Sequence, residues 1–160
     1  MKNSANTLLL FLGILCLAWD ANGPGEPVSY YAIWKLPITV ATMDTLRTEE
    51  REGVLYYYLE TDNPPGAQLV KDNIPQLTGD FSEGDPVDAC IDDVSRSDLE
   101  TAGFFVKAYD SQGNSSGPSN IVHCGKDQSC IDNHLLPGQV TGIRKVTGIH
   151  LEPDPPERGR

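Results

Sequence analysis

The residues Gly113-Asn-Ser-Ser-Gly117 match the G-x-S-x-G pattern of serine hydrolases, with Ser115 at the position of the nucleophile. That chemistry needs the serine on a sharp turn from a strand into a helix, with a histidine in reach as general base. Here Pro118 and a further strand pattern follow the motif, and His123 lies on that same returning strand. We therefore expect a hairpin loop at this motif and no catalytic residue.

The same loop contains the sequon Asn114-Ser-Ser116, which is the acceptor pattern for N-glycosylation. A predicted loop tip exposes its side chains and tolerates a bulky glycan. Asn114 is therefore a candidate glycosylation site if the source is eukaryotic.

The four cysteines offer disulfide chemistry. Cys16 lies in an apolar N-terminal stretch, which leaves Cys90, Cys124 and Cys130 in the rest of the chain. Cys124 and Cys130 enclose five residues and meet easily, whereas Cys90 with either partner would close a longer loop. We predict a Cys124–Cys130 disulfide and keep Cys90 open as an alternative partner. A zinc site is disfavoured because the neighbouring histidines lack paired C-x-x-C spacing.

Acidic side chains are concentrated between residues 80 and 100, where eight of them accompany a single base, Arg96. Clustered carboxylates can bind Ca²⁺, but the spacing of an EF-hand is missing. A solvated acidic edge, which discourages pairing with other strands, is the simpler interpretation. We predict no metal and no cofactor.

Aromatic residues gather in two strand-like stretches, SYYAIWK and VLYYYLE. Alternation turns neighbouring tyrosines to opposite faces of a sheet, so some of them must reach solvent if only one face is buried. Exposed aromatic rings stack on sugars and anchor protein partners. Tyr31, Tyr57 and Tyr109 are therefore candidates for a binding surface.

The N-terminal residues predict export. Lys2 precedes an eleven-residue uncharged run from Leu8 to Ala18, which is too short to span a bilayer and fits a secretory signal peptide cleaved after Ala18. Two alternatives stay open: lipid anchoring through Cys16, and a buried N-terminal helix of a cytosolic protein. We predict a secreted protein, extracellular or periplasmic, with no transmembrane segment. The formal charge of −11 over 160 residues disfavours nucleic-acid binding.

Short strands must position these residues, because no helical pattern reaches ten residues. The segment GFFVKAYD alternates strictly, with Phe104, Val106 and Ala108 predicted to face a core and Phe105, Lys107 and Tyr109 a half-wet surface. The charged cluster 47–52 predicts one or two helical turns or a solvated loop. The other predicted strands are 29–35, 54–60, 67–71, 87–95 and 119–124. Short strands separated by turns indicate an all-β, antiparallel immunoglobulin-like sandwich of about seven strands.

The segment FFVKAYDSQGNSSGPSN resembles the last two strands of fibronectin type III modules, with Ala-x-Asp, a glycine-containing turn and Ser-x-Pro-Ser. The matching positions are Ala108, Asp110, Gly113, Ser116, Pro118 and Ser119. Upstream, the segments Ile33–Pro37 and Leu55–Gly66 are similar to the second and third strands, and Leu99 stands where the family often has a leucine. Phe104 departs from the pattern, since it replaces the corner tyrosine. The resemblance implies an extracellular, non-catalytic module used for binding, adhesion or spacing.

The predicted organisation is a signal peptide at 1–18, a linker at 19–28, a fibronectin type III-like sandwich at 29–124 and a tail at 125–160. The repeated VTGI within residues 139–151 predicts an extra strand or hairpin on the sandwich, or a free arm for a partner. The function we predict is binding of a protein or a surface glycan. The alternatives are a structural subunit of a surface assembly and a small secreted hydrolase.

Overall fold

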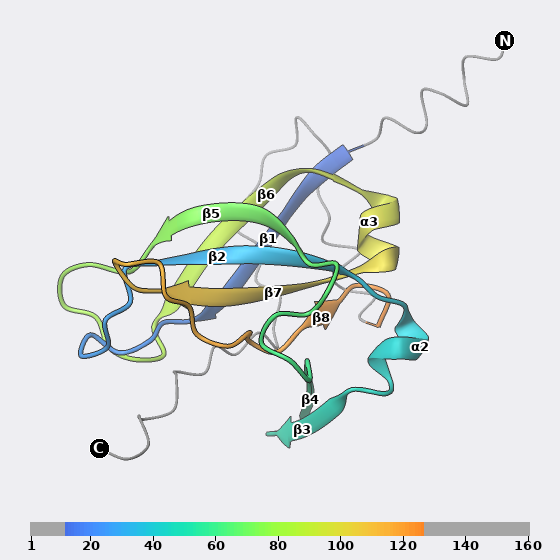
Figure 1. Ribbon diagram of the computed structural model, residues 1–160, viewed down its shortest axis with the longest axis horizontal. Helices are drawn as coiled ribbons and strands as arrows, with labels where there is room; N and C mark the ends of the chain where they lie inside the picture. The colour runs from blue at the N-terminus through green and yellow to red at the C-terminus, as the bar shows by residue number, and fades with distance from the viewer. Residues whose placement is uncertain (1–11, 127–160) are drawn as a thin grey trace, which may run out of the picture.

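Two antiparallel sheets pack face to face in the computed structural model, which describes residues 12–126 (Figure 1). This all-β sandwich confirms the predicted fold class. The smaller sheet pairs β1 with β6, the larger has the order β5-β2-β7-β8, and β3 with β4 forms a separate hairpin. The bounds are β1 Leu12–Asp20, β2 Tyr30–Pro37, α2 Val40–Met43, β3 Arg47–Arg51, β4 Val54–Tyr58, β5 Gln68–Pro75, β6 Pro86–Ser95, α3 Arg96–Thr101, β7 Ala102–Tyr109 and β8 Val122–His123.

The main core lies between the two sheets and follows from the period of two along each strand. Phe104, Val106 and Ala108 form the inner face of β7 and are buried in this core, as predicted. Opposite them, β1 contributes Leu15 and Leu17, which are also fully buried. Valine, isoleucine and alanine of β6 complete the layer.

The outer face of β7, defined by Phe105, Lys107 and Tyr109, differs from its prediction. A half-wet surface was expected there, but Phe105 and Lys107 are buried. The connection between β2 and β4 folds back over this face and forms a second core around Phe105 and Ile121. The expectation was wrong because alternation identifies the two faces of a strand but not what covers them.

The covering connection consists of α2 and the β3–β4 hairpin, which lies below β8 in Figure 1. Thr39 caps α2 by accepting a hydrogen bond from the backbone N–H of Thr42. The hairpin turns at Glu52 and Gly53, whose φ angles of 52° and 82° match the two positive values of a type I′ turn. Residues 47–51 are therefore a strand, and not the helical turn or loop that the sequence predicted.

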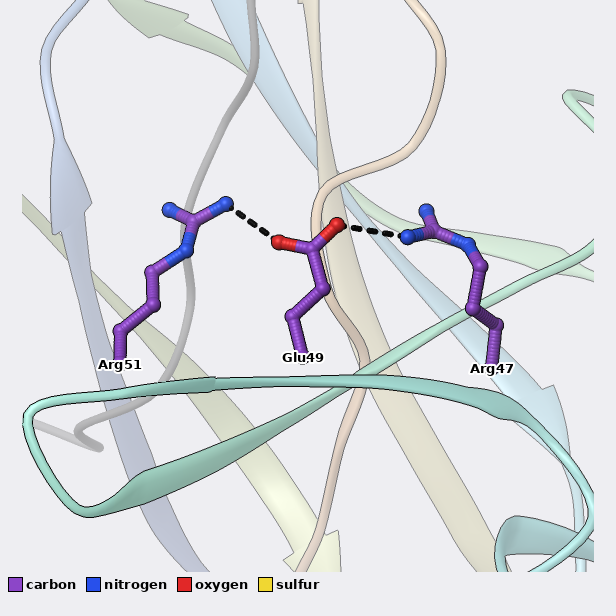
Figure 2. A network of polar contacts seen from close by, with 3 residues as sticks. All are labelled: Arg47, Glu49 and Arg51. Atoms are coloured by element: carbon purple, nitrogen blue, oxygen red, sulfur yellow. Dashed lines mark hydrogen bonds and ion pairs between the residues drawn. The ribbon is translucent and has the colours of Figure 1, made fainter.

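Three charged side chains line one face of β3 (Figure 2). Glu49 accepts hydrogen bonds from Arg47 at 2.6 Å and from Arg51 at 2.7 Å. These guanidinium groups lie over the rings of Tyr58 and Tyr56, at 4.5 Å and 5.7 Å from the ring centroids. Because the cluster is partly exposed, its contribution to stability is small.

The segment Leu12–Asp20 is a strand of the main core, although it overlaps the predicted signal peptide. It pairs with β6 in a register that sets Cys16 opposite Cys90, and the two form a disulfide. Trp19, placed in the predicted linker, is buried at the end of this strand. Residues 1–11 lie outside the described residues. The signal peptide stays a prediction. Cleavage after Ala18 would remove most of β1, so this fold is not compatible with cleavage at that position.

Candidate functional site

The strand register gathers four large side chains on the outer side of the larger sheet. In the β2–β7 pair, Tyr30 lies opposite Tyr109, and Trp34 lies opposite Phe105. Ala32 lies opposite Lys107, and its small side chain leaves room for the lysine. Since i and i+2 residues share a face, Tyr30, Trp34, Lys107 and Tyr109 point to the same side.

The aromatic members of this group hold one another in place. The rings of Tyr30 and Tyr109 are stacked, with centroids 5.0 Å apart and planes 4° from parallel. The indole Nε1 of Trp34 donates a hydrogen bond of 3.0 Å to the hydroxyl of Tyr109. Burial raises the pKa of Tyr109, because the phenolate would lose hydration. The hydroxyl therefore stays protonated at neutral pH.

Lys107 brings a positive charge into this aromatic setting with 5% of the residue exposed. Its Nζ donates to the backbone oxygen of Asp62 and to Oδ1 of Asn63, both at 3.1 Å, and lies 5.9 Å from the ring centroid of Trp34. Burial lowers the pKa of this amine, while the nearby Asp62 carboxylate opposes that shift. The lysine thus fastens the loop after β4 to the sheet.

These groups surround a cavity of about 310 Å³. That size is at the lower end of the range typical of small-molecule sites. We call it the aromatic–lysine pocket, lined by Trp34, Asn63, Pro64, Lys107, Tyr109 and Ser115, with Phe105 and Ala67 beside them. Apolar walls with a few convergent polar groups can bind a small polar ligand that also offers an apolar face.

The predicted tyrosine surface is corrected in part. Tyr31 has 0% exposure and belongs to the main core, so it cannot contact a partner. Its hydroxyl bonds Asn22 and Gln76, and burial raises its pKa. Tyr57 packs against the second core with its ring 5.4 Å from Nζ of Lys126. Of the three tyrosines, Tyr109 lines the pocket.

The prediction of this surface missed Lys107, and it included Trp34 only as one of the aromatic residues in the stretch SYYAIWK. The alternation of GFFVKAYD already placed Lys107 beside Phe105 and Tyr109, but no sequence pattern indicated that this face would be covered at one end and hollow at the other. That Trp34 lies beside Lys107 could be found only from the register of β2 against β7.

The G-x-S-x-G motif forms a hairpin loop, as expected. The Asp110 carboxylate accepts hydrogen bonds from the side-chain and backbone N–H groups of Asn114, which hold its pKa below the usual range. Ser115 pairs with Tyr109 through an isolated β-bridge, so no strand-to-helix elbow is present at this serine. Asn114 is exposed, and its glycosylation stays a prediction.

His123 is not placed to act as a base. It is buried, and its Nδ1 accepts a hydrogen bond from the backbone N–H of Gly125 at 2.9 Å. Its Nε2 then carries the proton and donates to the backbone oxygen of Ile38 at 2.7 Å. Both ring nitrogens are therefore occupied by backbone groups.

The disulfide partner of Cys90 differs from the alternative partners that were predicted for it. Its partner is Cys16, which excludes the alternative pairing with Cys124 or Cys130. Cys124 is buried and disulfide-bonded. Cys130 lies outside the described residues, as do the tail beyond Lys126 and its segment 139–151, so the Cys124–Cys130 pairing stays a prediction.

Two further findings concern residues 12–126. No group of three or more histidine, cysteine, aspartate or glutamate side chains in this part of the chain is arranged to hold a metal ion. None of the helices described there is long and apolar enough to cross a membrane.

No protein-family model, curated protein or solved structure matches this chain.

Proposed function

We propose that this chain is a non-catalytic, fibronectin type III-like module that acts outside the cytoplasm and binds a glycan in the aromatic–lysine pocket. The observation that carries the proposal is the convergence of Trp34, Tyr109 and Lys107 on the part of the sheet face that the hairpin leaves uncovered. Sugars present C–H faces that pack on aromatic rings and hydroxyls that bind amides and serines.

The serines of the Ser-x-Pro-Ser segment support the family resemblance by their hydrogen bonds. Oγ of Ser116 accepts from the backbone N–H of Ala108, and Oγ of Ser119 accepts from that of Val106, both at 2.9 Å. Pro118 between them has no N–H to donate. The two hydroxyls thus accept hydrogen bonds from backbone N–H groups of β7 where strand pairing is interrupted. This is a physical reason for serines at both ends of the Ser-x-Pro-Ser segment.

Export is supported by the Cys16–Cys90 disulfide, since such bonds persist in oxidising compartments. In this proposal β1 remains in the folded module, because Leu15, Leu17 and Cys16 are buried parts of it. A leader that is cleaved after Ala18 would take these residues away. The proposal therefore keeps the extracellular or periplasmic location and moves any cleavage away from Ala18.

A glycan array probed with the full-length, disulfide-bonded chain tests the proposal, and titration calorimetry with each selected sugar measures its affinity. We expect Trp34→Ala to weaken binding at least about tenfold, the size of effect that loss of one aromatic ring has on the binding of a stacked nucleic-acid base. Tyr56→Ala is the matched control, because it removes a half-buried aromatic ring from the hairpin face outside the pocket. Equal binding by wild type and Trp34→Ala would place any glycan site elsewhere, and no binding to any glycan would overturn the proposal.

A further inference from the structure

The buried charge of Lys107 points to one class of sugar. Building on the proposed function, we infer that the aromatic–lysine pocket selects hexuronic acids, and that the ammonium group of Lys107 binds their carboxylate. Three observations carry this inference: the unused hydrogen-bonding capacity of Lys107, the absence within residues 12–126 of a carboxylate in ion-pair contact with it, and the polar and aromatic lining around it.

A lysine ammonium has three N–H donors. At Lys107 two of them are used, and both acceptors are neutral oxygens, from the Asp62 backbone and the Asn63 side chain. One donor remains for a group that enters the pocket, which Lys107 lines. A carboxylate oxygen is the acceptor that forms the strongest bond with such a donor.

Four other cations of the described region have a carboxylate in ion-pair contact, which Lys107 lacks, whereas Lys71 donates to the backbone oxygen of Cys90. Lys35 lies 3.5 Å from a carboxylate oxygen of Asp98, and Lys126 pairs with Asp44 at 2.5 Å. Arg47 and Arg51 share Glu49. These four side chains are all more exposed than Lys107. Within residues 12–126 no carboxylate forms an ion pair with Lys107, although burial makes a counter-charge more valuable there than at the surface.

The remaining lining suits the rest of a sugar. Trp34 and Tyr109 offer aromatic surface on one side, while Asn63 and Ser115 offer polar groups for hydroxyls. Two neighbouring carboxylates could repel an acidic ligand. That of Asp62 is close enough to oppose the lowering of the Lys107 pKa, and that of Asp110 already accepts hydrogen bonds from loop N–H groups. The net charge of −11 acts mainly at long range, and salt at about 0.15 M screens charges beyond about 8 Å.

The test is titration calorimetry of the full chain with methyl glucuronide, its isosteric amide and methyl glucoside, at neutral pH and physiological salt. We expect the acid to bind at least about tenfold more tightly than the amide, a difference of about 1.4 kcal/mol. Lys107→Met should lower binding of the acid to the level of the amide. Lys126→Met is the control, because it removes a lysine that lies outside the pocket lining.

A second measurement does not depend on a variant. Because the pKa of free Lys107 is lowered by burial, a bound carboxylate should raise it. Binding of the acid at alkaline pH, below the ordinary lysine pKa of 10.5, should then take up protons, which calorimetry detects as a dependence of the heat on the ionisation enthalpy of the buffer. Binding of the amide should take up none.

The outcomes separate the two proposals. If the amide and the glucoside bind as tightly as the acid, or if the acid takes up no protons, the hexuronate inference is wrong while the glycan site stands. If neither neutral nor acidic sugars bind, the proposed function itself fails.

Discussion

Side chains of β7 alternate between its inner and outer faces, and the two faces pack against different parts of the molecule. On the inner face, Phe104, Val106 and Ala108 meet a second sheet along the whole strand. On the outer face, Phe105 meets α2 and the hairpin, whereas Lys107 and Tyr109 line a cavity. One face is thus a continuous core, and the other is divided into a core and a pocket.

This difference shows that a segment which covers only part of a sheet face can leave a pocket at the point where the covering ends. The hairpin and α2 cover one end of the outer face, and the loop after β4 returns over the sheet near Lys107. The pocket lies where this returning loop meets the sheet. Substitutions and deletions that weaken one face or the other test this comparison, and their expected effects on stability decrease in the order given.

Removal of residues 1–18 should have the largest effect, because it deletes most of β1, one of the two strands in the sheet that covers the inner face. Each buried leucine that is lost contributes about 2–5 kcal/mol. The Cys16–Cys90 disulfide closes a separation of 74 residues and adds about 4 kcal/mol in the chain-entropy model. Since domains are stable by about 5–15 kcal/mol, we expect no cooperative thermal transition by circular dichroism.

The control is Leu55→Ala, a residue with 49% exposure on the hairpin, which should change stability by less than about 0.5 kcal/mol. If the chain that starts at Trp19 melts cooperatively near the wild-type Tm, β1 is dispensable and cleavage after Ala18 becomes compatible with the fold.

Phe104→Ala and Phe105→Ala compare the two faces directly. Both rings are 1% exposed, so each substitution should lower the free energy of unfolding by about 3–5 kcal/mol. Urea unfolding at neutral pH measures both values. A loss below about 1 kcal/mol for Phe105→Ala, with the full loss for Phe104→Ala, would show that the outer face is wet and that the second core is absent.

Lys107→Met tests the buried charge on the outer face through pH. The folded-state pKa of Lys107 lies below the ordinary value of 10.5, so the unfolded chain holds the proton more tightly. The penalty of burying the charge is complete below the folded pKa and disappears as pH rises to 10.5. The stability of wild type relative to Lys107→Met should therefore increase across this alkaline window.

The quantity to compare is the difference in unfolding free energy between wild type and Lys107→Met at each pH. Tyr31 and Tyr109 have raised pKa values, so they lower the stability of both proteins as pH rises above 10. Chemical unfolding at several alkaline pH values supplies the measurement. A constant difference across the window would mean that the ammonium group is as well hydrated in the folded protein as in the unfolded chain.

Glu49→Gln should have the smallest effect, since it removes an exposed carboxylate from the hairpin (Figure 2). The two arginines hold the pKa of Glu49 below its ordinary value of 4.5, so its contribution is present above 4.5 and is lost as pH falls through the lowered pKa. We expect a small decrease in Tm at neutral pH that shrinks with added salt. An equal decrease in strong acid, where the carboxylate is protonated, would contradict an electrostatic role.

Much of the fold could be predicted from short patterns in the sequence. The alternation of GFFVKAYD identified a strand and its inner face, because burial of one face requires apolar residues at every second position. Turn residues after Tyr109 identified the loop that contains Asn114. These features depend on neighbours in the chain, and so they can be derived locally.

Other features could not be derived in this way. The apolar run before Trp19 has the composition of both a leader and a buried strand, and only its pairing with β6 makes it β1. Four of the five residues in 47–51 are charged and have low strand propensity, yet pairing with β4 makes this segment a strand. The Cys16–Cys90 bond joins residues far apart in sequence, which spacing alone does not select.

By itself, then, the sequence determined the all-β class, the strand that carries Lys107 and the face on which that lysine lies. The tertiary structure alone decided that Tyr31 is buried, that Trp34 stands beside Lys107, and that a pocket remains between the sheet and the loop after β4. The physical reason is that alternation is a property of one strand, whereas burial and cavities depend on which distant segments of the chain pack against it.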